Sequence, residues 1–410
     1  MKRVLVTGMG VISPVGNSIS AFWGNLTAGV CGVGLIDRFD TEKLKVKVAA
    51  QVRDFDPQNY GMDVSSARRM DLYAQYAVAA AVQAMEGSGF ENKNPRRFGV
   101  YVGSGIGGMH TFSAESEKLL TRGPDRVSPF FIPMMIGNMA AGNIAIRFDA
   151  QGPCLPVVTA CATSTHAIGE AYRAIRHGYA DAILAGGSEA AVVPLAVAGF
   201  TSCKALSEEK DPNLASLPFD MRRKGFVMGE GAGIVLLEEA EHALSRGARV
   251  YGEVVGYGNT CDAYHITAPN PEGSGAAEAI RLALEEAGGL SGERLYINAH
   301  GTGTPLNDKV ETLSIKLALG EERAKAALVS STKSATGHML GAAGAAEFIA
   351  ALMAVRTGTV PPTLHLDEPD PECDLDYVPH SARQWQPELA LSISLGFGGH
   401  NGALAVRSAL

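Results

Sequence analysis

The amino-acid sequence predicts an α/β fold that contains two copies of one unit, each with a mixed sheet covered by helices. Two observations support this prediction. The same order of helices and strands occurs in both halves of the 410 residues, and several of the predicted helices are rich in alanine and glycine. Helices with such small side chains can pack closely on both sides, so we expect them to form a buried middle layer.

The first repeated element is a helix followed by a buried strand that runs into glycines. In the first half, residues 70–87 form an alanine-rich helical pattern and residues 98–102 a short apolar run. In the second half, residues 275–288 and 295–298 follow the same plan. A short apolar run that ends at a glycine-rich turn is typical of a strand buried in a sheet.

The second repeated element is a strand, a sharp turn, a helix of small residues and a closing glycine. Residues 157–178 and 328–358 both have this order, and each is followed by a strand that ends in glycines, at 182–187 and at 391–399. A repeat of this length is too long for a solenoid, so we expect a duplicated domain.

The boundary between the two units is placed after a charged helix that ends near residue 246. Residues 1–249 then form one unit and residues 250–410 the other. The first unit carries an insertion at residues 109–150, between its glycine-rich strand end and the strand that leads to Cys161.

Composition and charge exclude several classes of function. The net charge of −8 argues against a general nucleic-acid binder, and no apolar run reaches the roughly 18 residues that a membrane helix needs. The six cysteines form no CxxC pair, and none has zinc-ligand spacing to a histidine. In a chain of this length they indicate reduced thiols, so we expect a cytoplasmic protein without a metal site.

Cys161 is the strongest candidate for a catalytic residue. It lies between a β-branched run and a helix of small residues that stops near Gly178. A thiol at a helix N-terminus faces the positive end of the helix dipole, so we expect a lowered pKa and more thiolate. The backbone N–H groups there also form a natural oxyanion site. The alternative is a buried core cysteine, the commoner fate of an isolated cysteine.

Two further strand-end turns carry histidines, His300 within residues 298–304 and His338 within residues 333–338. In a duplicated α/β fold, strand ends from both halves can meet at one cleft, where a thiol and two imidazoles would form an acyl-transfer site. Taken singly, each histidine is more often structural. A cysteine hydrolase is disfavoured because it has no obvious task for a second histidine. A dinucleotide site at residues 8–13 is disfavoured because the third glycine of the fingerprint is missing.

Short motifs follow one another along the whole chain. They are Val6–Gly10, Ser128–Pro133, Thr159–Cys161, Pro218–Asp220, Gly225–Gly233, Asn298–Thr302, Ser331–Ser334, Gly337–His338 and Gly396–Gly399. With these motifs the chain resembles, from end to end, the elongating β-ketoacyl-[acyl-carrier-protein] synthases of the thiolase superfamily, most closely the synthase II group. The second histidine distinguishes it from the initiating synthase III type, and Cys161 distinguishes it from chain-length factors, which lack the nucleophile.

The resemblance implies a duplicated thiolase-like fold of five layers, αβαβα, with two mixed sheets, in a homodimer. It also implies an acyltransferase of fatty-acid chain elongation. The reaction would be a decarboxylating Claisen condensation. Its two substrates would be carrier protein loaded with an acyl chain and carrier protein loaded with malonate, and it would pass through an acyl-cysteine intermediate. Acyl-carrier protein would be the partner, and no cofactor is expected beyond the phosphopantetheine that the carrier protein bears.

The resemblance further implies roles for single residues. Cys161 would accept the acyl chain, and His300 and His338 would stabilise the enolate and assist decarboxylation. The N–H groups of Cys161 and Phe397 would form the oxyanion hole, with the Phe397 ring as a gate to the acyl pocket. The remaining implied residues are Lys333 and Glu347, which would orient the histidines, Asp308 and Glu311 near His300, Thr302 and Thr304 at the pantetheine arm, and Ile106 along the acyl pocket.

The resemblance also implies a docking site for an acidic carrier protein, since this chain has basic residues at the docking positions of the family. They are Arg68, Arg69, Arg126 and Lys204. In a net-acidic chain only a local basic patch can steer an acidic partner. The chain departs from the family pattern at Asp125, usually basic, at Ile393, usually asparagine, and at Leu395, usually phenylalanine. These departures put in doubt a monovalent cation site in this stretch and the stiffness of the gate.

Three alternatives remain. The same chemistry in a type II polyketide or polyene pathway would use the same cysteine and both histidines. A thiolase that acts on coenzyme A is disfavoured by the Cys–His–His set. A non-enzymatic partner subunit is disfavoured by Cys161.

Overall fold

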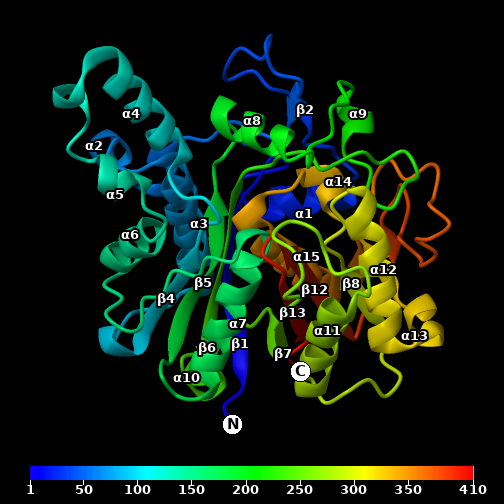
Figure 1. Ribbon diagram of the computed structural model, residues 1–410. Coiled ribbons are helices and arrows are strands. Elements are labelled where there is room, and N and C mark those ends of the chain that lie inside the picture. Colours follow the sequence, from blue (N-terminus) through cyan, green and yellow to red (C-terminus); the bar gives the residue numbers. More distant parts are fainter. Residues whose placement is uncertain (410) are drawn as a thin grey trace.

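The computed structural model describes residues 1–409 (Figure 1). Its strands are β1 (Val4–Ile12), β2 (Gly34–Leu35), β3 (Val48–Ala49), β4 (Phe98–Gly103), β5 (Ala182–Glu189), β6 (Gly231–Glu239), β7 (Gly252–Cys261), β8 (Leu295–Asn298), β9 (Leu328–Ser330), β10 (Thr359–Val360), β11 (Arg383–Gln384), β12 (Leu389–Gly396) and β13 (His400–Arg407). Its α-helices are α1 (Ile19–Thr27), α2 (Val64–Ala67), α3 (Leu72–Ser88), α4 (Met109–Arg122), α5 (Phe131–Met135), α6 (Met139–Phe148), α7 (Thr163–Arg176), α8 (Pro194–Ser202), α9 (Pro212–Ala215), α10 (Ala240–Ser245), α11 (Ser274–Glu286), α12 (Pro305–Leu319), α13 (Glu321–Ala326), α14 (Lys333–Thr336) and α15 (Ala343–Thr357). Short 3₁₀ turns are η1 (Pro57–Tyr60), η2 (Pro95–Arg97), η3 (Pro124–Arg126), η4 (Ala160–Ala162) and η5 (Leu340–Ala342).

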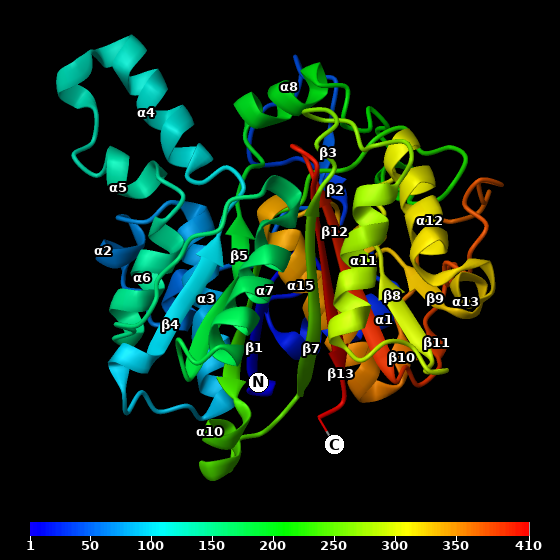
Figure 2. The ribbon, with the colours of Figure 1, turned by 60° about the horizontal axis from the view of Figure 1, so that its bottom comes forward.

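The large sheet has nine strands in the order β4-β5-β6-β1-β7-β13-β12-β8-β9. Strands of the two halves meet at β1 and β7, which pair over only three positions, from Val4 opposite Val254 to Val6 opposite Gly252. Figure 2 shows α7 and α15 between the two parts of the sheet beyond this junction. The two sheets that we expected are therefore two parts that touch along one short ladder.

The two parts of the sheet have the same topology. Outward from the junction, β1-β6-β5-β4 corresponds to β7-β13-β12-β8. In both parts the last of these matching pairs (β4 with β5, β8 with β12) is parallel and the other matching pairs are antiparallel, while β9 adds one more strand, parallel to β8, in the second part. The repeats that the sequence predicts fall on matching elements, α3–β4 with α11–β8 and η4–α7 with η5–α15. We propose that the units divide at residues 249 and 250, between α10 and β7.

Helices form the outer and middle layers. On the outer faces, α3 packs against β1 and β6, and α11 packs against β7 and β13. Because α7 and α15 fill the middle, the layers follow the order αβαβα, as the resemblance implies. The insertion at residues 109–150 contains α4, α5 and α6 and lies on the outer side of β4 (Figure 1).

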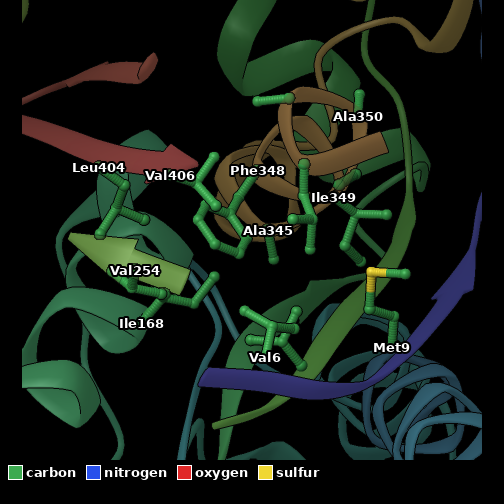
Figure 3. Packing of buried hydrophobic residues seen from close by; sticks show 14 of the residues in the cluster. Val6, Met9, Ile168, Val254, Ala345, Phe348, Ile349, Ala350, Leu404 and Val406 are labelled. Atoms are coloured by element: carbon green, nitrogen blue, oxygen red, sulfur yellow. The ribbon is translucent and has the colours of Figure 1, made fainter. Parts of the chain in front are cut away.

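Side chains from both halves pack around α15 in the middle layer (Figure 3). Val6 of β1, Ile168 of α7, Val254 of β7 and Leu404 of β13 belong to the same buried cluster as Phe348 of α15. Each of these side chains is at most 1% exposed. Burial of these apolar side chains stabilises the packing of both halves against the one helix α15.

Apart from Glu347 and Arg356, the helix α15 is apolar on all sides. The window Leu340–Thr357 is the one stretch among residues 1–409 that is long and apolar enough to cross a membrane, but 83% of it is buried inside the protein. A helix that is apolar all round is expected where protein surrounds it, as in this middle layer.

Small residues let α7 and α15 approach each other at their N-terminal ends. A Cβ atom on Gly344 would overlap Thr165 Oγ1 and lie 3.0 Å from Ser394 Oγ. At the next residue, the Ala345 N–H donates a hydrogen bond to Ser164 Oγ at 2.8 Å. The turns η4 and η5, which precede the two helices, therefore lie in contact.

The substitution Gly344→Ala is expected to destabilise the fold. Its methyl group has no space between α15 and Thr165, and such overpacking typically costs about 1–3 kcal/mol. Urea unfolding measures the change in free energy. Gly24→Ala in α1 is the matched control, because no atom lies within 4 Å of its new Cβ, and it should raise stability by up to about 1 kcal/mol. Equal stability of Gly344→Ala and wild type would contradict this account of the packing.

Candidate active site

A cavity of about 360 Å³ lies where turns of the two halves meet. Cys161 lines it from the first half, and His300, His338 and Phe397 line it from the second half. The thiol and the two imidazoles that the sequence singled out therefore share one cavity.

The turn η4 holds Cys161 at the start of α7. Ala160, the residue before it, has φ of +51°, a left-handed conformation that is strained for alanine and marks a sharp turn. Gly396 lets the end of β12 come close, since a Cβ atom there would lie 2.8 Å from Thr159 O and 3.4 Å from Cys161 N. The backbone N–H of Phe397, the next residue after Gly396, favours the thiolate form of Cys161. The nucleophile turn and the end of β12, which carry the N–H groups of Cys161 and Phe397, therefore lie against each other.

Burial raises the pKa of the Cys161 thiol to about 11. The Lys333 ammonium and the Phe397 N–H favour the thiolate, but the removal of the sulfur from water is the larger effect, and Glu189 and Glu347 add to it. Our expectation of a lowered pKa, drawn from the helix terminus alone, is therefore wrong. The resting site holds a neutral thiol at pH 7.

The His338 ring is fixed in one tautomer. The Leu340 N–H donates to Nδ1 at 3.3 Å, so Nδ1 is the acceptor and the ring proton lies on Nε2. Nε2 is buried and has no partner among residues 1–409. The ring packs edge-on against Phe226, with centroids 5.1 Å apart, and against His300, with centroids 5.3 Å apart. This leaves one N–H donor free for a substrate.

Two buried carboxylates hold the backbone of the His300 loop. Glu311 accepts from His300 N at 2.6 Å and from Gly301 N at 2.7 Å, and burial raises the pKa of Glu311 to about 7. Asp308 accepts from Gly303 N at 3.2 Å. The two acidic residues near His300 thus act on its main chain rather than on its ring.

Lys333 and Glu347 form a buried, hydrogen-bonded ion pair with side chains 1% and 3% exposed. Burial, and after it the Lys333 charge, lowers the pKa of both His300 and His338 well below the ordinary value. Both imidazoles are therefore neutral at pH 7 and act as hydrogen-bond donors rather than as cations. Within this pair it is the Lys333 charge that acts on the two histidines.

The cavity extends from Cys161 to the protein surface. Thr302 and Thr304, which were expected at the pantetheine arm, both line it, and their hydroxyl groups lie 3.0 Å apart. Cys203 and Lys204 line the cavity too and are exposed, so they mark its mouth. Lys204 is the one expected docking residue that lies at this mouth.

Other expected site residues lie apart from the cavity in this chain. Ile106 does not line it, and its side chain is 40% exposed. Arg68 and Arg69 follow α2, and Arg126 ends η3; all three are exposed. In Figures 1 and 2, α2 and α5 lie on one side of the molecule and α12, which lines the cavity, on the other.

The departures from the family pattern have clear places in the structure. Leu395 lines the cavity and is 9% exposed. Ile393 of β12 belongs to the apolar cluster between the sheet and the outer helix α11. Because side chains alternate along a strand, its neighbours Ser392 and Ser394 face the middle layer instead. Asp125 is exposed in η3. The replacement at Ile393 therefore removes no polar group from the middle-layer face of β12.

Sequence reasoning missed Asp262. Its carboxylate accepts from Asn270 N at 2.9 Å and from Asn401 Nδ2 at 2.8 Å, and its own N–H donates to Gly399 O at 2.8 Å. It thus ties the Phe397 loop to the loop after β7. No local pattern marks such an aspartate, because two of its three partners, Gly399 and Asn401, lie more than a hundred residues away in the sequence.

Comparison with known proteins gives consistent matches over the whole chain. The model of the beta-ketoacyl synthase N-terminal domain matches residues 1–243, and that of the C-terminal domain matches residues 251–367. The 3-oxoacyl-[acyl-carrier-protein] synthase 2 of Synechocystis is 51% identical over 99% of this chain and 98% of its own length, and that of Staphylococcus aureus is 48% identical over the same shares. A solved complex of a type II polyketide synthase acyl-carrier protein with its ketosynthase has a TM-score of 0.91 and 34% identity, with full coverage of both chains.

Alkylation of Cys161 by iodoacetamide is expected to accelerate with pH far above neutrality, because only the thiolate reacts. With a pKa of about 11, the thiolate fraction at pH 8 is about one in a thousand. Mass spectrometry of the Cys161 peptide at a series of pH values measures the rate, with the exposed Cys203 as an internal control for the reagent. A rate that levels off near pH 7 would show that the thiolate is already formed in the resting site.

Proposed function

The chain belongs to the beta-ketoacyl synthase family, and from this premise we propose that it is a 3-oxoacyl-[acyl-carrier-protein] synthase of fatty-acid chain elongation. The observation that carries the proposal is the single cavity in which Cys161 lies with His300 and His338. Two neutral imidazoles beside one thiol suit an enzyme that must both hold an acyl group and stabilise a carbanion.

The first half-reaction transfers the acyl chain to the enzyme. The Cys161 sulfur attacks the acyl thioester, and negative charge develops on the carbonyl oxygen. The N–H groups of Cys161 and Phe397 would stabilise this charge, and the close approach of the end of β12 to the nucleophile turn supports this assignment. The C–S bond to pantetheine then breaks, and the proton that Cys161 loses ends on the pantetheine sulfur. The acyl-enzyme is neutral, which suits a site that disfavours a thiolate.

The second half-reaction uses the histidines. The carbonyl oxygen of the malonyl thioester accepts a hydrogen bond from His338 Nε2–H, and His300 supplies a second donor. When the C–C bond to the carboxylate breaks, CO2 leaves and the electron pair is held as an enolate between the two rings. The enolate carbon attacks the acyl-Cys161 carbonyl, the C–S bond to Cys161 breaks, and the sulfur takes up one proton from solvent, which restores the neutral thiol. Neutral donors are adequate because both rings are buried, where a hydrogen bond to a developing charge is stronger than in water.

Acyl-carrier protein is the proposed partner, supported by the similar ketosynthase solved with its carrier protein. Lys204 at the mouth would meet an acidic partner first, while Arg68, Arg69 and Arg126 would act from a separate surface. We also propose a homodimer in the cytoplasm, without a resident cofactor or metal. Exposed apolar side chains support the homodimer, and they are Phe112, Leu120, Ile132, Ile146, Leu155 and Val158.

A type II polyketide pathway is the second candidate, because the similar solved complex comes from such a pathway. Elongation of fatty acids is favoured because identity to the named 3-oxoacyl synthases is higher, at 48–51% against 34%. Supplying the enzyme with acyl-carrier proteins that bear saturated chains of increasing length, and with chains that bear several keto groups, separates the two.

The division of labour between thiol and imidazoles can be tested directly. Cys161→Gln should abolish condensation but leave decarboxylation of malonyl-carrier protein, since the histidines hold the enolate. His300→Ala and His338→Ala should each lower decarboxylation by about 10²–10³-fold, the usual effect of removing one such donor. Release of CO2 from malonyl-carrier protein is measured for each variant.

The matched control is Cys203→Ala, a thiol at the mouth of the same cavity, which should leave both activities unchanged. Normal decarboxylation in both histidine variants would refute the proposed mechanism. A wild-type protein that forms no 3-oxoacyl product with any carrier-bound chain would refute the function itself.

A further inference from the structure

The carboxylate of Glu189, at the end of β5, lies where three turns meet beside the active site. Its side chain is fully buried. It accepts hydrogen bonds from Ser104 Oγ at 2.8 Å, Gly105 N at 2.8 Å, Ile106 N at 3.2 Å and Gly341 N at 3.0 Å. One side chain thereby joins the turn after β4, the end of β5 and η5, the turn that follows His338.

All of these partners donate a hydrogen atom to Glu189. Three are backbone N–H groups, and the Ser104 hydroxyl accepts from Gly107 N at 2.9 Å, which directs its own proton toward the carboxylate. A shell made only of donors suits an ionised carboxylate, which can only accept. Burial raises the pKa of Glu189, and these hydrogen bonds, rather than a cation, oppose that rise.

The backbone around Glu189 is shaped for the carboxylate. A Cβ atom on Gly105 or on Gly341 would lie 2.8 Å from Glu189 Oε2. Any larger residue at either position would collide with the carboxylate or push it away. The two turns also touch directly, since a Cβ atom on Gly341 would overlap Gly105 N, and the carboxylate binds both of them at this contact.

The internal duplication shows which part of the other half corresponds to the turn that Glu189 binds. In η5, Leu340-Gly341-Ala342 takes the place that Ala160-Cys161-Ala162 has in η4, and the first residue of each turn is left-handed, with φ of +48° and +51°. Glu189 ends β5 as Gly396 ends β12. The Gly341 N–H is thus the counterpart of the Cys161 N–H. In the proposed mechanism the Cys161 N–H faces the oxyanion of the substrate, whereas the Gly341 N–H donates to the carboxylate of Glu189.

We propose that Glu189 is a positioning residue of the condensing site. Its ionised carboxylate fixes η5, and through it His338, against the turn after β4 and the nucleophile turn. Backbone N–H groups that converge on one point require an anion there. Without it, Gly341 is released and the ring of His338, three residues before it, loses its place in the cavity. This inference rests on the proposed function.

The test is Glu189→Gln, which keeps the shape of the side chain but places an NH2 group against backbone donors. Decarboxylation of malonyl-carrier protein should fall by about 100-fold, the scale of a displacement of about 1 Å at a catalytic group. Acyl transfer to Cys161 should still reach completion, because the oxyanion hole comes from the other strand end.

A second readout tests whether Glu189 is ionised, as the proposal requires. Glu189 is one of the charges that disfavour the Cys161 thiolate, so its removal should move the pH profile of Cys161 alkylation to lower pH. Lys333, Glu347, His300 and His338, which are the other titratable groups that face Cys161, are unchanged in this variant. An unchanged profile would show that the Glu189 carboxylate is not ionised in the resting site, which contradicts the proposal.

Glu238→Gln is the matched control, since Glu238 is also fully buried. It lies at the far end of β6 from Glu189, because it pairs with Ala182 at the start of β5, whereas Glu189 ends β5. The variant should lower stability without changing the ratio of decarboxylation to acyl transfer. If Glu189→Gln does not fold, Ser104→Ala removes one hydrogen bond and should lower decarboxylation in the same direction by a smaller factor.

The inference is overturned if Glu189→Gln behaves as Glu238→Gln does, or if Ser104→Ala decarboxylates at the wild-type rate when Glu189→Gln cannot be obtained. Both results presuppose an active wild type. An inactive wild type would refute the proposed function instead, so the two failures are distinguishable.

Discussion

The close approach of α7 and α15 between the two parts of the sheet is the constraint on which the site depends. Gly344 and Ser164 bring the two helices together, and each helix begins at a turn that packs on a strand end of the other half, η4 on β12 and η5 on β5. The nucleophile and the second histidine therefore belong to different halves and to one cavity. Neither half forms the site alone.

This burial also decides the electrostatics. The same removal from water that lowers the pKa of His300 and His338 raises the pKa of Cys161. The cavity consequently favours neutral groups, with N–H donors aimed at the positions where charge develops. The buried Lys333–Glu347 pair and the Glu189 carboxylate are the charges that remain close to the thiol, and each is held by its own partners.

The sequence predicts much of this arrangement because the signals are local. Periodicity and glycines give the duplicated α/β plan, and Cys161, His300 and His338 each stand at a strand-end turn. The raised pKa of Cys161 could not be predicted, since it comes from burial by the other half of the chain. The same holds for Glu189, whose partner Gly341 is 152 residues away, and for Ile106, whose side chain does not line the cavity in this chain.

The central claim is that one cavity passes an acyl chain from Cys161 to a carbanion held by two neutral histidines. Rapid-quench mass spectrometry of a single turnover tests it most directly. Carrier protein loaded with an acyl chain is added first, and carrier protein loaded with malonate is added second. The account predicts one acyl group on the Cys161 peptide, which disappears at the rate at which 3-oxoacyl-carrier protein forms. Product that forms while Cys161 remains unacylated, or an acyl group that stays on Cys161 while product accumulates, would contradict it.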